Sequence, residues 1–119
     1  MYIFYKFVYF IEESKCVLSL VPPMFTESPT NQTIPKGQSA SFPCSATGDP
    51  APSIKWHRPG DLINNDAHFI ILPNGTLLVN SVTEHDSGWF ACSATNEAGT
   101  REAKAYLLVA GKEIVKYFS

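Results

Sequence analysis

Charged residues are scarce in this sequence. They make up 17% of 119 residues, with nine Lys and Arg against eleven Asp and Glu, and the formal net charge at pH 7 is −2. A protein that binds phosphate backbones or anionic membranes presents an excess of Lys and Arg on one face. The composition therefore argues against nucleic acid as a partner.

The sequence also lacks an apolar run long enough to cross a bilayer. The apolar N-terminal stretch, residues 1–11, is interrupted by Lys6 and followed by Glu12-Glu13, so it is well short of the roughly 20 residues that a transmembrane helix needs. It has neither the Leu- or Ala-rich run nor the small-residue cleavage site of a secretory signal peptide. We interpret residues 1–15 as a fragment end or a mistaken exon, and keep a signal peptide as the alternative.

Catalytic and metal-binding patterns are missing as well. His57, His68 and His85 lie on separate expected strands or turns, and no cluster of His, Cys, Asp and Glu has the spacing of metal ligands. Residues 84–87 have the residue types of a catalytic triad, but adjacent side chains cannot point at one another. We therefore expect no enzyme activity, no cofactor and no bound metal.

What the sequence does have is a series of short segments with alternating apolar residues, separated by turn-forming Gly, Pro and Asn. Alternation predicts a common core led by Phe42, Trp56, Leu77 and Phe90. The other expected core residues are Ala40, Cys44, Ala46, Ile54, Val79, Val82, Cys92, Ala94, Ala105, Leu107 and Val109. Proline donates no ladder hydrogen bond, so we expect a bulge or a loss of pairing at Pro43.

The cysteine and tryptophan positions indicate which kind of β-protein this is. Cys44 and Cys92 bracket Trp56, and Cys92 ends the motif Asp86–Cys92. This order and spacing is the sequence mark of an immunoglobulin sandwich, in which a disulfide joins two facing sheets and a large ring packs on the bridge. We predict an all-β, immunoglobulin-like two-sheet Greek-key sandwich with a Cys44–Cys92 disulfide. Such a disulfide implies an extracellular or cell-surface location.

Further motifs make the chain resemble the I-set immunoglobulin domains of tandem cell-surface and matrix proteins. The resemblance covers residues 22–110. Its motifs are residues 22–25 (PPMF), 37–39 (GQS), 48–56 (GDPAPSIKW), 74–79 (NGTLLV), 86–92 (DSGWFAC) and 94–99 (ATNEAG). Residues 31–33 and 42–44 look most like roundabout-type axon-guidance receptors, while peroxidasin-like and hemicentin-like matrix proteins share most of the rest.

One position departs from the family pattern. These domains usually have a tyrosine two residues before the second cysteine, where this chain has Phe90. The tyrosine hydroxyl bonds back to the chain at the corner before the strand. Phenylalanine keeps the ring burial and loses a hydrogen bond worth typically about 1 kcal/mol, so we expect the fold to survive.

The resemblance also divides the chain into parts. We expect an irregular N-terminal segment at residues 1–21, the I-set domain at 22–110, and a tail or linker at 111–119. Residues 18–23 look like the last strand of a preceding module that breaks at the double proline, and residues 105–111 have a similar form, which suggests a cut from a tandem array. Cys16 is the spare cysteine, and we place it in a segment that is not folded, with a free thiol or a cross-chain bond as alternatives.

Two tripeptides match the N-glycosylation pattern, Asn31-Gln32-Thr33 and Asn74-Gly75-Thr76. The alternative is that each is a chance match that carries no glycan. We favour Asn31, because the Asn-Gly pair at residues 74–75 is typical of a tight hairpin turn, which would occupy Asn74.

Alternation also predicts an outward face beside the disulfide. Lys55 and His57 contribute from one strand and Trp89 from the strand of the second cysteine. The last strand adds Lys104, Tyr106 and Leu108. Exposed aromatic and apolar residues mark protein contacts. The alternative is that Trp89 simply lies over Lys stems at the margin of the sheet.

We expect an extracellular protein–protein recognition and spacer module of a cell adhesion or axon-guidance receptor, with a membrane-anchored parent. Its partner would be a protein ligand or a neighbouring immunoglobulin domain. The alternative is a structural module of a peroxidasin- or hemicentin-like matrix protein, or of an intracellular muscle filament. The receptor role follows from the resemblance alone, since this scaffold serves many functions.

Overall fold

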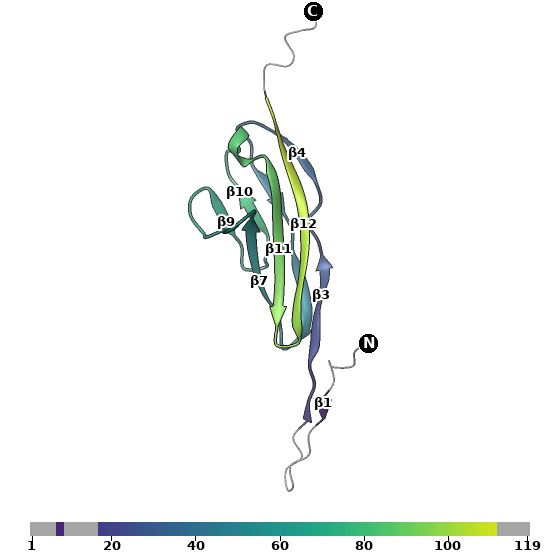
Figure 1. Cartoon of the computed structure of the whole chain (residues 1–119). Helices are drawn as coiled ribbons and strands as arrows, with labels where there is room; N and C mark the ends of the chain where they lie inside the picture. The colour runs from purple at the N-terminus through teal and green to yellow at the C-terminus, as the bar shows by residue number, and fades with distance from the viewer. Residues whose placement is uncertain (1–6, 9–16, 112–119) are drawn as a thin grey trace, which may run out of the picture.

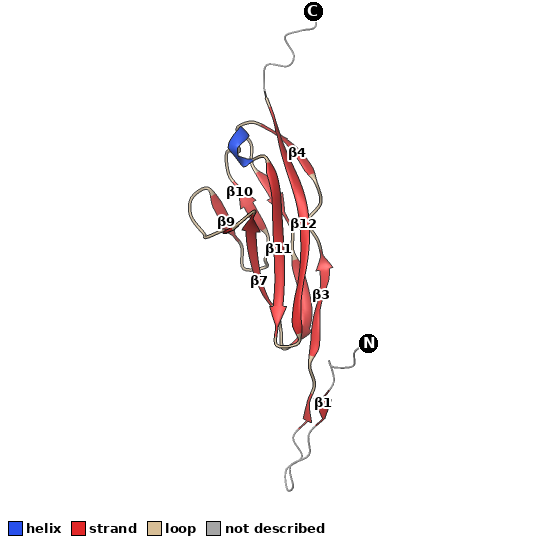
Figure 2. Cartoon of the chain, in the orientation of Figure 1, coloured by secondary structure: helices blue, strands red, loops and turns tan. Residues whose placement is uncertain are grey.

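The structure, a computed structural model, describes residues 7–8 and 17–111 (Figure 1). The expectations for residues 1–6, for residues 9–16 with Cys16, and for residues 112–119 lie outside the described residues. The described part is almost entirely strand, with one short 3-10 turn, η1 (Glu84–Asp86) (Figure 2). The strands are β1 (Phe7–Val8), β2 (Val17–Leu18), β3 (Val21–Glu27), β4 (Gln32–Pro35), β5 (Ala40–Phe42), β6 (Ser45–Asp49), β7 (Ser53–Arg58), β8 (Asp61–Leu62), β9 (Phe69–Ile71), β10 (Leu77–Val79), β11 (Gly88–Asn96) and β12 (Gly99–Ala110).

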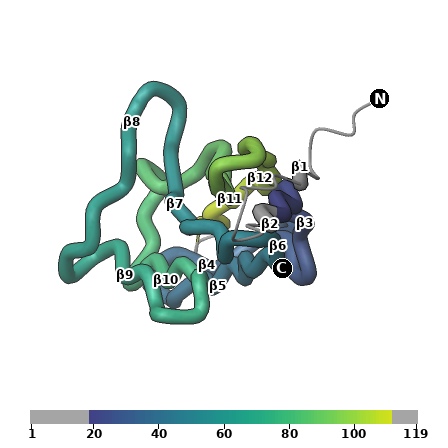
Figure 3. The backbone as a smooth tube through the Cα atoms, turned by 90° about the horizontal axis from the view of Figure 1, so that it is seen from below, coloured from purple at the N-terminus to yellow at the C-terminus, as the bar shows by residue number. Residues whose placement is uncertain are grey.

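The strands of residues 21–110 form two facing layers. One is a five-stranded sheet with the order β4-β12-β11-β7-β8, and the other combines the sheet β5-β10-β9 with the pair β3-β6. Figure 3 shows β7, β11 and β12 on one side of the interior and β5, β9 and β10 on the other. The chain changes layer after β3, β4, β6, β8 and β10. The predicted all-β Greek-key sandwich is thus confirmed.

The core lies between the layers, where the alternating side chains of both sheets meet. Phe42, Trp56, Leu77 and Phe90 are all 0% exposed. The rings of Phe42 and Phe90 stack with their centroids 5.4 Å apart. Trp56 Nε1 donates a hydrogen bond of 2.8 Å to the carbonyl oxygen of Gly75, so the polar atom of this buried ring is satisfied.

A disulfide joins the layers through Cys44 and Cys92, whose Cα atoms are 6.6 Å apart. Both cysteines are buried. Ile63 is buried as well, although no alternation marked it, because it follows β8 and its backbone N–H donates to Trp56. Ala46 and Ile54, expected in the core, are only partly buried.

Pro43 lies between β5 and β6 and interrupts what would otherwise be one continuous strand. β5 ends at Phe42 and pairs with β10, whereas β6 begins at Ser45 and pairs with β3. The expected loss of pairing at Pro43 is confirmed, since the residue without an N–H lies at the point where the pairing partner changes.

The expected strand break at the double proline was wrong, whereas the expectation that residues 1–21 include the end of a preceding module stays a prediction. Pro22 and Pro23 lie inside β3, which pairs with β6 of the same sandwich. The register shifts between Val21 and Met24, so the ladder skips the two residues that cannot donate. Pro23 is fully buried, and its packing keeps the strand in place despite the missing hydrogen bonds.

Candidate interaction face

The outward face of the five-stranded sheet collects the side chains that alternation placed there. On β11 Trp89 precedes the buried Phe90 in the alternating pattern and is 48% exposed. The register pairs Trp89 with Tyr106 on β12, and pairs the next outward position, Ala91, with Lys104 on β12 and His57 on β7. The structure thereby gathers the whole predicted set on one face: Lys55, His57, Trp89, Lys104, Tyr106 and Leu108.

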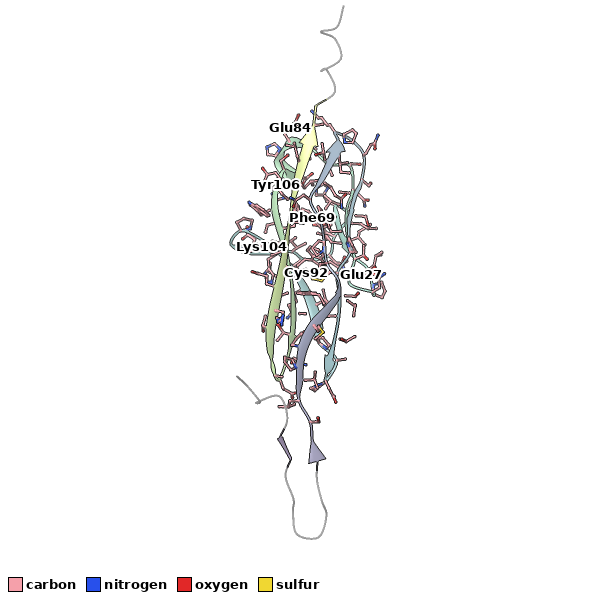
Figure 4. The ribbon with its side chains drawn as sticks, turned by 90° about the vertical axis from the view of Figure 1, so that its right-hand side faces the viewer. Glu27, Phe69, Glu84, Cys92, Lys104 and Tyr106 are labelled. Atoms are coloured by element: carbon pink, nitrogen blue, oxygen red, sulfur yellow. A yellow bond between two sulfur atoms is a disulfide. The ribbon has the colours of Figure 1, made fainter. Side chains whose placement is uncertain are left out.

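An aromatic pair forms the centre of this face. The rings of Trp89 and Tyr106 meet edge to face, with centroids 5.2 Å apart and planes at 85°. This geometry suits the quadrupoles of the two rings and fixes their side chains before any partner arrives. Leu108, two residues along β12 from Tyr106, is 50% exposed. Figure 4 shows Tyr106 and Lys104 on one side of the sandwich, with Cys92 inside and Glu27 on the opposite side.

A groove of about 800 Å³ borders the aromatic pair on the side of the β7–β8 hairpin. Leu62 of β8, 50% exposed, pairs with His57 and so lies on the same face. Charges of both signs line the groove, with Lys104 opposite in sign to Asp61 and Glu102, and the imidazole of His57 lines it as well. The face therefore offers apolar area, aromatic rings and charged groups together, which is the composition of a protein contact.

Sequence reasoning missed Leu62 and the groove. The signal was present in Pro59-Gly60, a turn-forming pair that follows β7 directly. Reading that pair as a hairpin turn would have predicted a short strand returning beside His57. Its second residue would then have joined the outward face.

Arg58 supports the face from the end of β7. Its two terminal nitrogens donate hydrogen bonds of 3.2 Å each to the carbonyl oxygens of Asp86 and Ser87. Its guanidinium carbon also lies 4.5 Å from the centroid of the Phe90 ring, a cation–π distance. One side chain thus ties β7 to the corner that precedes β11. Arg58 therefore connects Phe90 to the corner without the hydroxyl that a tyrosine at this position would supply.

Asp86 organises the same corner from within. It is 5% exposed, and its Oδ2 accepts a hydrogen bond of 2.8 Å from the backbone N–H of Thr83, as in a capping box. Its Oδ1 lies 2.8 Å from Nε2 of His68. Ser87 then joins the corner to β12, because its Oγ accepts from the backbone N–H of Val109. These contacts fix where β11 begins, and hence where Trp89 emerges.

Comparison with known families identifies the module. The model of the immunoglobulin I-set domain matches residues 23–109. The chain belongs to the immunoglobulin I-set family.

Relatives of this I-set module include the kinds of protein that its motifs resemble. It is 42% identical over 108 residues to human Hemicentin-1, covering 89% of this chain and 2% of that protein. It is 39% identical over 80 residues to human Roundabout homolog 3, covering 66% of this chain and 6% of that protein. It is 36% identical over 87 residues to human Peroxidasin homolog, covering 73% of this chain and 6% of that protein. The module thus spans only a small fraction of each relative.

Solved structures share the fold. The structure titled Drosophila OTK, extracellular domains 3-5 matches with a TM-score of 0.72 and 30% identity, over 76% of this chain and 32% of that one. A chimeric titin Z1Z2 matches with a TM-score of 0.74 and 31% identity, over 79% of this chain and 100% of that one.

The I-set module exposes both asparagines of the glycosylation motifs, in different settings. Asn31 precedes β4, and its Oδ1 accepts a hydrogen bond of 2.8 Å from the backbone N–H of Tyr106. Asn74 sits in a tight turn, where its Oδ1 accepts from the backbone N–H of Thr76 at 3.0 Å. The next residue, Gly75, has φ +97°, and a side chain there would collide with the carbonyl of Cys44. Glycan occupancy of both sites stays a prediction.

Within residues 7–8 and 17–111, no group of three or more His, Cys, Asp and Glu is arranged to hold a metal ion. In the same part of the chain, no helix is long and apolar enough to cross a membrane.

Proposed function

We propose that this I-set module is an extracellular recognition and spacer module, and that the outward face of β7, β11 and β12 receives a protein partner. The observation that carries the proposal is the half-exposed Trp89, held edge to face by Tyr106 between the exposed side chains of Leu62 and Leu108. Burying such area against a partner stabilises a complex by about 25 cal/mol per Å². Rigid aromatic anchors of this kind dominate many interfaces.

The chemistry of the face favours a folded protein as the partner. The groove beside Trp89 combines Lys104 with Asp61 and Glu102, so a partner with charges of both signs can pair with it. The role is binding rather than catalysis. The partner is either a separate protein ligand or a neighbouring immunoglobulin domain.

The extracellular setting is supported by two observations. The Cys44–Cys92 disulfide needs an oxidising compartment to persist. A structural relative is described as extracellular domains, and one sequence relative, 33% identical over 90 residues, is the Netrin receptor DCC of rat. We propose a membrane-anchored cell adhesion or axon-guidance receptor as the parent. The alternative is a structural module of a matrix protein or of an intracellular muscle filament.

A binding screen tests the recognition role. The module, secreted as an oligomeric fusion to raise avidity, would be applied to an array of cell-surface and matrix ectodomains. Trp89→Ala should weaken each specific signal at least about tenfold, the effect of removing a central aromatic anchor. Tyr106→Ala should weaken it as well, because the Tyr106 ring holds the Trp89 ring edge to face. Met24→Ala is the matched control, because Met24 is 61% exposed on β3 in the other layer.

Folding of each variant would be checked by thermal unfolding. If the two face variants bind as tightly as the control variant, the face is not the recognition site. If no ectodomain binds even the wild-type module, the spacer role alone remains supported.

A further inference from the structure

Asn31 lies at the edge of the same outward face. It precedes β4, the strand that runs parallel to β12 and pairs Thr33 with Leu108. Gln32 turns the other way, because its Nε2 donates to the carbonyl oxygen of Ser41 in the opposite layer. Asn31 and Thr33 are exposed and share the outward phase of the strand with Leu108. The asparagine and the threonine of the glycosylation motif therefore both face the side that carries Tyr106.

The side chain of Asn31 is held in one orientation. Its Oδ1 accepts the hydrogen bond from the backbone N–H of Tyr106, at 2.8 Å. Its Nδ2, the atom to which a sugar is attached, has no hydrogen-bond partner in the described part of the chain. A group attached to Nδ2 would thus leave the hydrogen bond intact. It would emerge beside β12, within reach of Tyr106 and Leu108.

We infer that Asn31 carries an N-linked glycan and that its first sugar packs on Tyr106 and Leu108. The inference rests on the proposed extracellular function, since the modification requires passage through the secretory pathway. Nδ2 of Asn31 forms a bond to C1 of N-acetylglucosamine, and the bond from C1 to a lipid diphosphate donor breaks. The lipid diphosphate leaves with the bonding electrons, and one amide proton is released.

The glycan restricts where a partner can dock. It covers the β12 margin of the face and leaves Trp89, His57 and the groove beside Leu62 open. A protein partner therefore approaches over β7 and β8 rather than over β4. The glycan would also shield Leu108, 50% exposed, from solvent, because a bulky solubilising group would lie over it.

Two substitutions at Thr33 test the modification without touching Asn31. Thr33→Val removes the hydroxyl that the motif requires but keeps the β-branched shape at an exposed strand position, and Thr33→Ser keeps the motif. The full chain would be secreted from mammalian cells behind a cleavable signal peptide and analysed by intact mass before and after N-glycosidase treatment. We expect the glycosidase to remove one glycan from Asn31 in wild type and in Thr33→Ser. The deamidation that the enzyme leaves at Asn31 identifies the site. Thr33→Val should have no glycan at Asn31. Unmodified Asn31 in the secreted, folded wild type would overturn the inference.

Hydroxyl-radical footprinting locates the sugar. The oxidation of Tyr106 and Leu108 should be about twofold slower in the glycosylated wild type than in Thr33→Val, as expected for cover by a bulky group, while Trp89 reacts equally in both. Equal oxidation of Tyr106 and Leu108 in the two proteins would refute the packing. The recognition proposal has a separate test. It is contradicted if Trp89→Ala leaves partner binding unchanged, whether or not Asn31 carries a glycan.

Discussion

At the scale of single residues, Arg58 connects β7 to the corner before β11, a role that no motif in the sequence indicates. It donates to two carbonyl oxygens of the corner, those of Asp86 and Ser87, and covers the ring of Phe90. Both carbonyls lie in a partly buried site, so losing the donor would leave them without a full complement of hydrogen bonds. The position of Trp89 therefore depends on a side chain whose hydrogen bonds go to the corner before β11 and not to Trp89 itself.

Replacing Arg58 measures that dependence. Arg58→Ala should lower the free energy of unfolding by about 2–3 kcal/mol, because it removes two charge-assisted hydrogen bonds and a cation–π contact. Arg101→Ala, at an exposed position of β12, is the control and should change stability little. Urea denaturation followed by tryptophan fluorescence gives both values. Equal stability of the two variants would show that the corner holds without Arg58.

At the scale of elements, the free edge of β9 is protected by the loop that precedes it. The strand has only three residues and pairs with β10 on one side. On the loop side, Oδ1 of Asp66 accepts hydrogen bonds of 2.8 Å from the backbone N–H groups of His68 and Phe69, and Oδ1 of Asn65 accepts one from Ile71. These side chains occupy donors that an edge strand would otherwise offer to another chain.

The hydrogen bonds to Asp66 make stability depend on pH. They hold the pKa of Asp66 below its ordinary value of 3.8, chiefly through the backbone N–H of Phe69 and then that of His68. Because the folded-state pKa is the lower one, the stabilising contribution is fully present above pH 3.8 and is lost as the pH falls through the folded-state value. Asp66→Asn should therefore be less stable than wild type at pH 7, and the difference should shrink toward pH 2.

Chemical denaturation of both proteins across that pH range checks the prediction. Asp61→Asn is the matched control, since Asp61 is an exposed carboxylate of β8 that accepts no hydrogen bond in the described part of the chain. It should leave the free energy of unfolding nearly unchanged throughout. A difference between wild type and Asp66→Asn that stays constant with pH would contradict the assigned role.

The sequence predicted the elements better than it predicted their connections. Strand periodicity has a fixed period of two, so it identified both the buried Phe42 and the outward Trp89 without tertiary information. Pro22-Pro23 was misjudged, because whether a strand tolerates prolines depends on the register slip opposite them. Arg58 and Leu62 were missed for the same reason: each acts on a segment that only folding brings near.

At the scale of the whole molecule, the two layers differ in what they present to solvent. One layer carries the aromatic face with Trp89 and Tyr106, and the glycosylation motif lies at its edge. The other layer exposes Met24 and Val21, which are 61% and 42% exposed. The proposed recognition face therefore lies on one layer alone. The disulfide between the layers holds that face on the sandwich.

The disulfide provides the last test, because it bears on both stability and location. Cys44 and Cys92 are separated by 48 positions, and closing a loop of that size stabilises a fold by about 4 kcal/mol in the chain-entropy model. The double variant Cys44→Ala with Cys92→Ala should lose stability of that order in urea denaturation, and reduced wild type should lose a similar amount. An intracellular filament module would function with both cysteines reduced, so its stability should not depend on the bridge. Wild-type protein that is equally stable with and without reductant would therefore argue against the extracellular role, whereas a fall of several kcal/mol supports it.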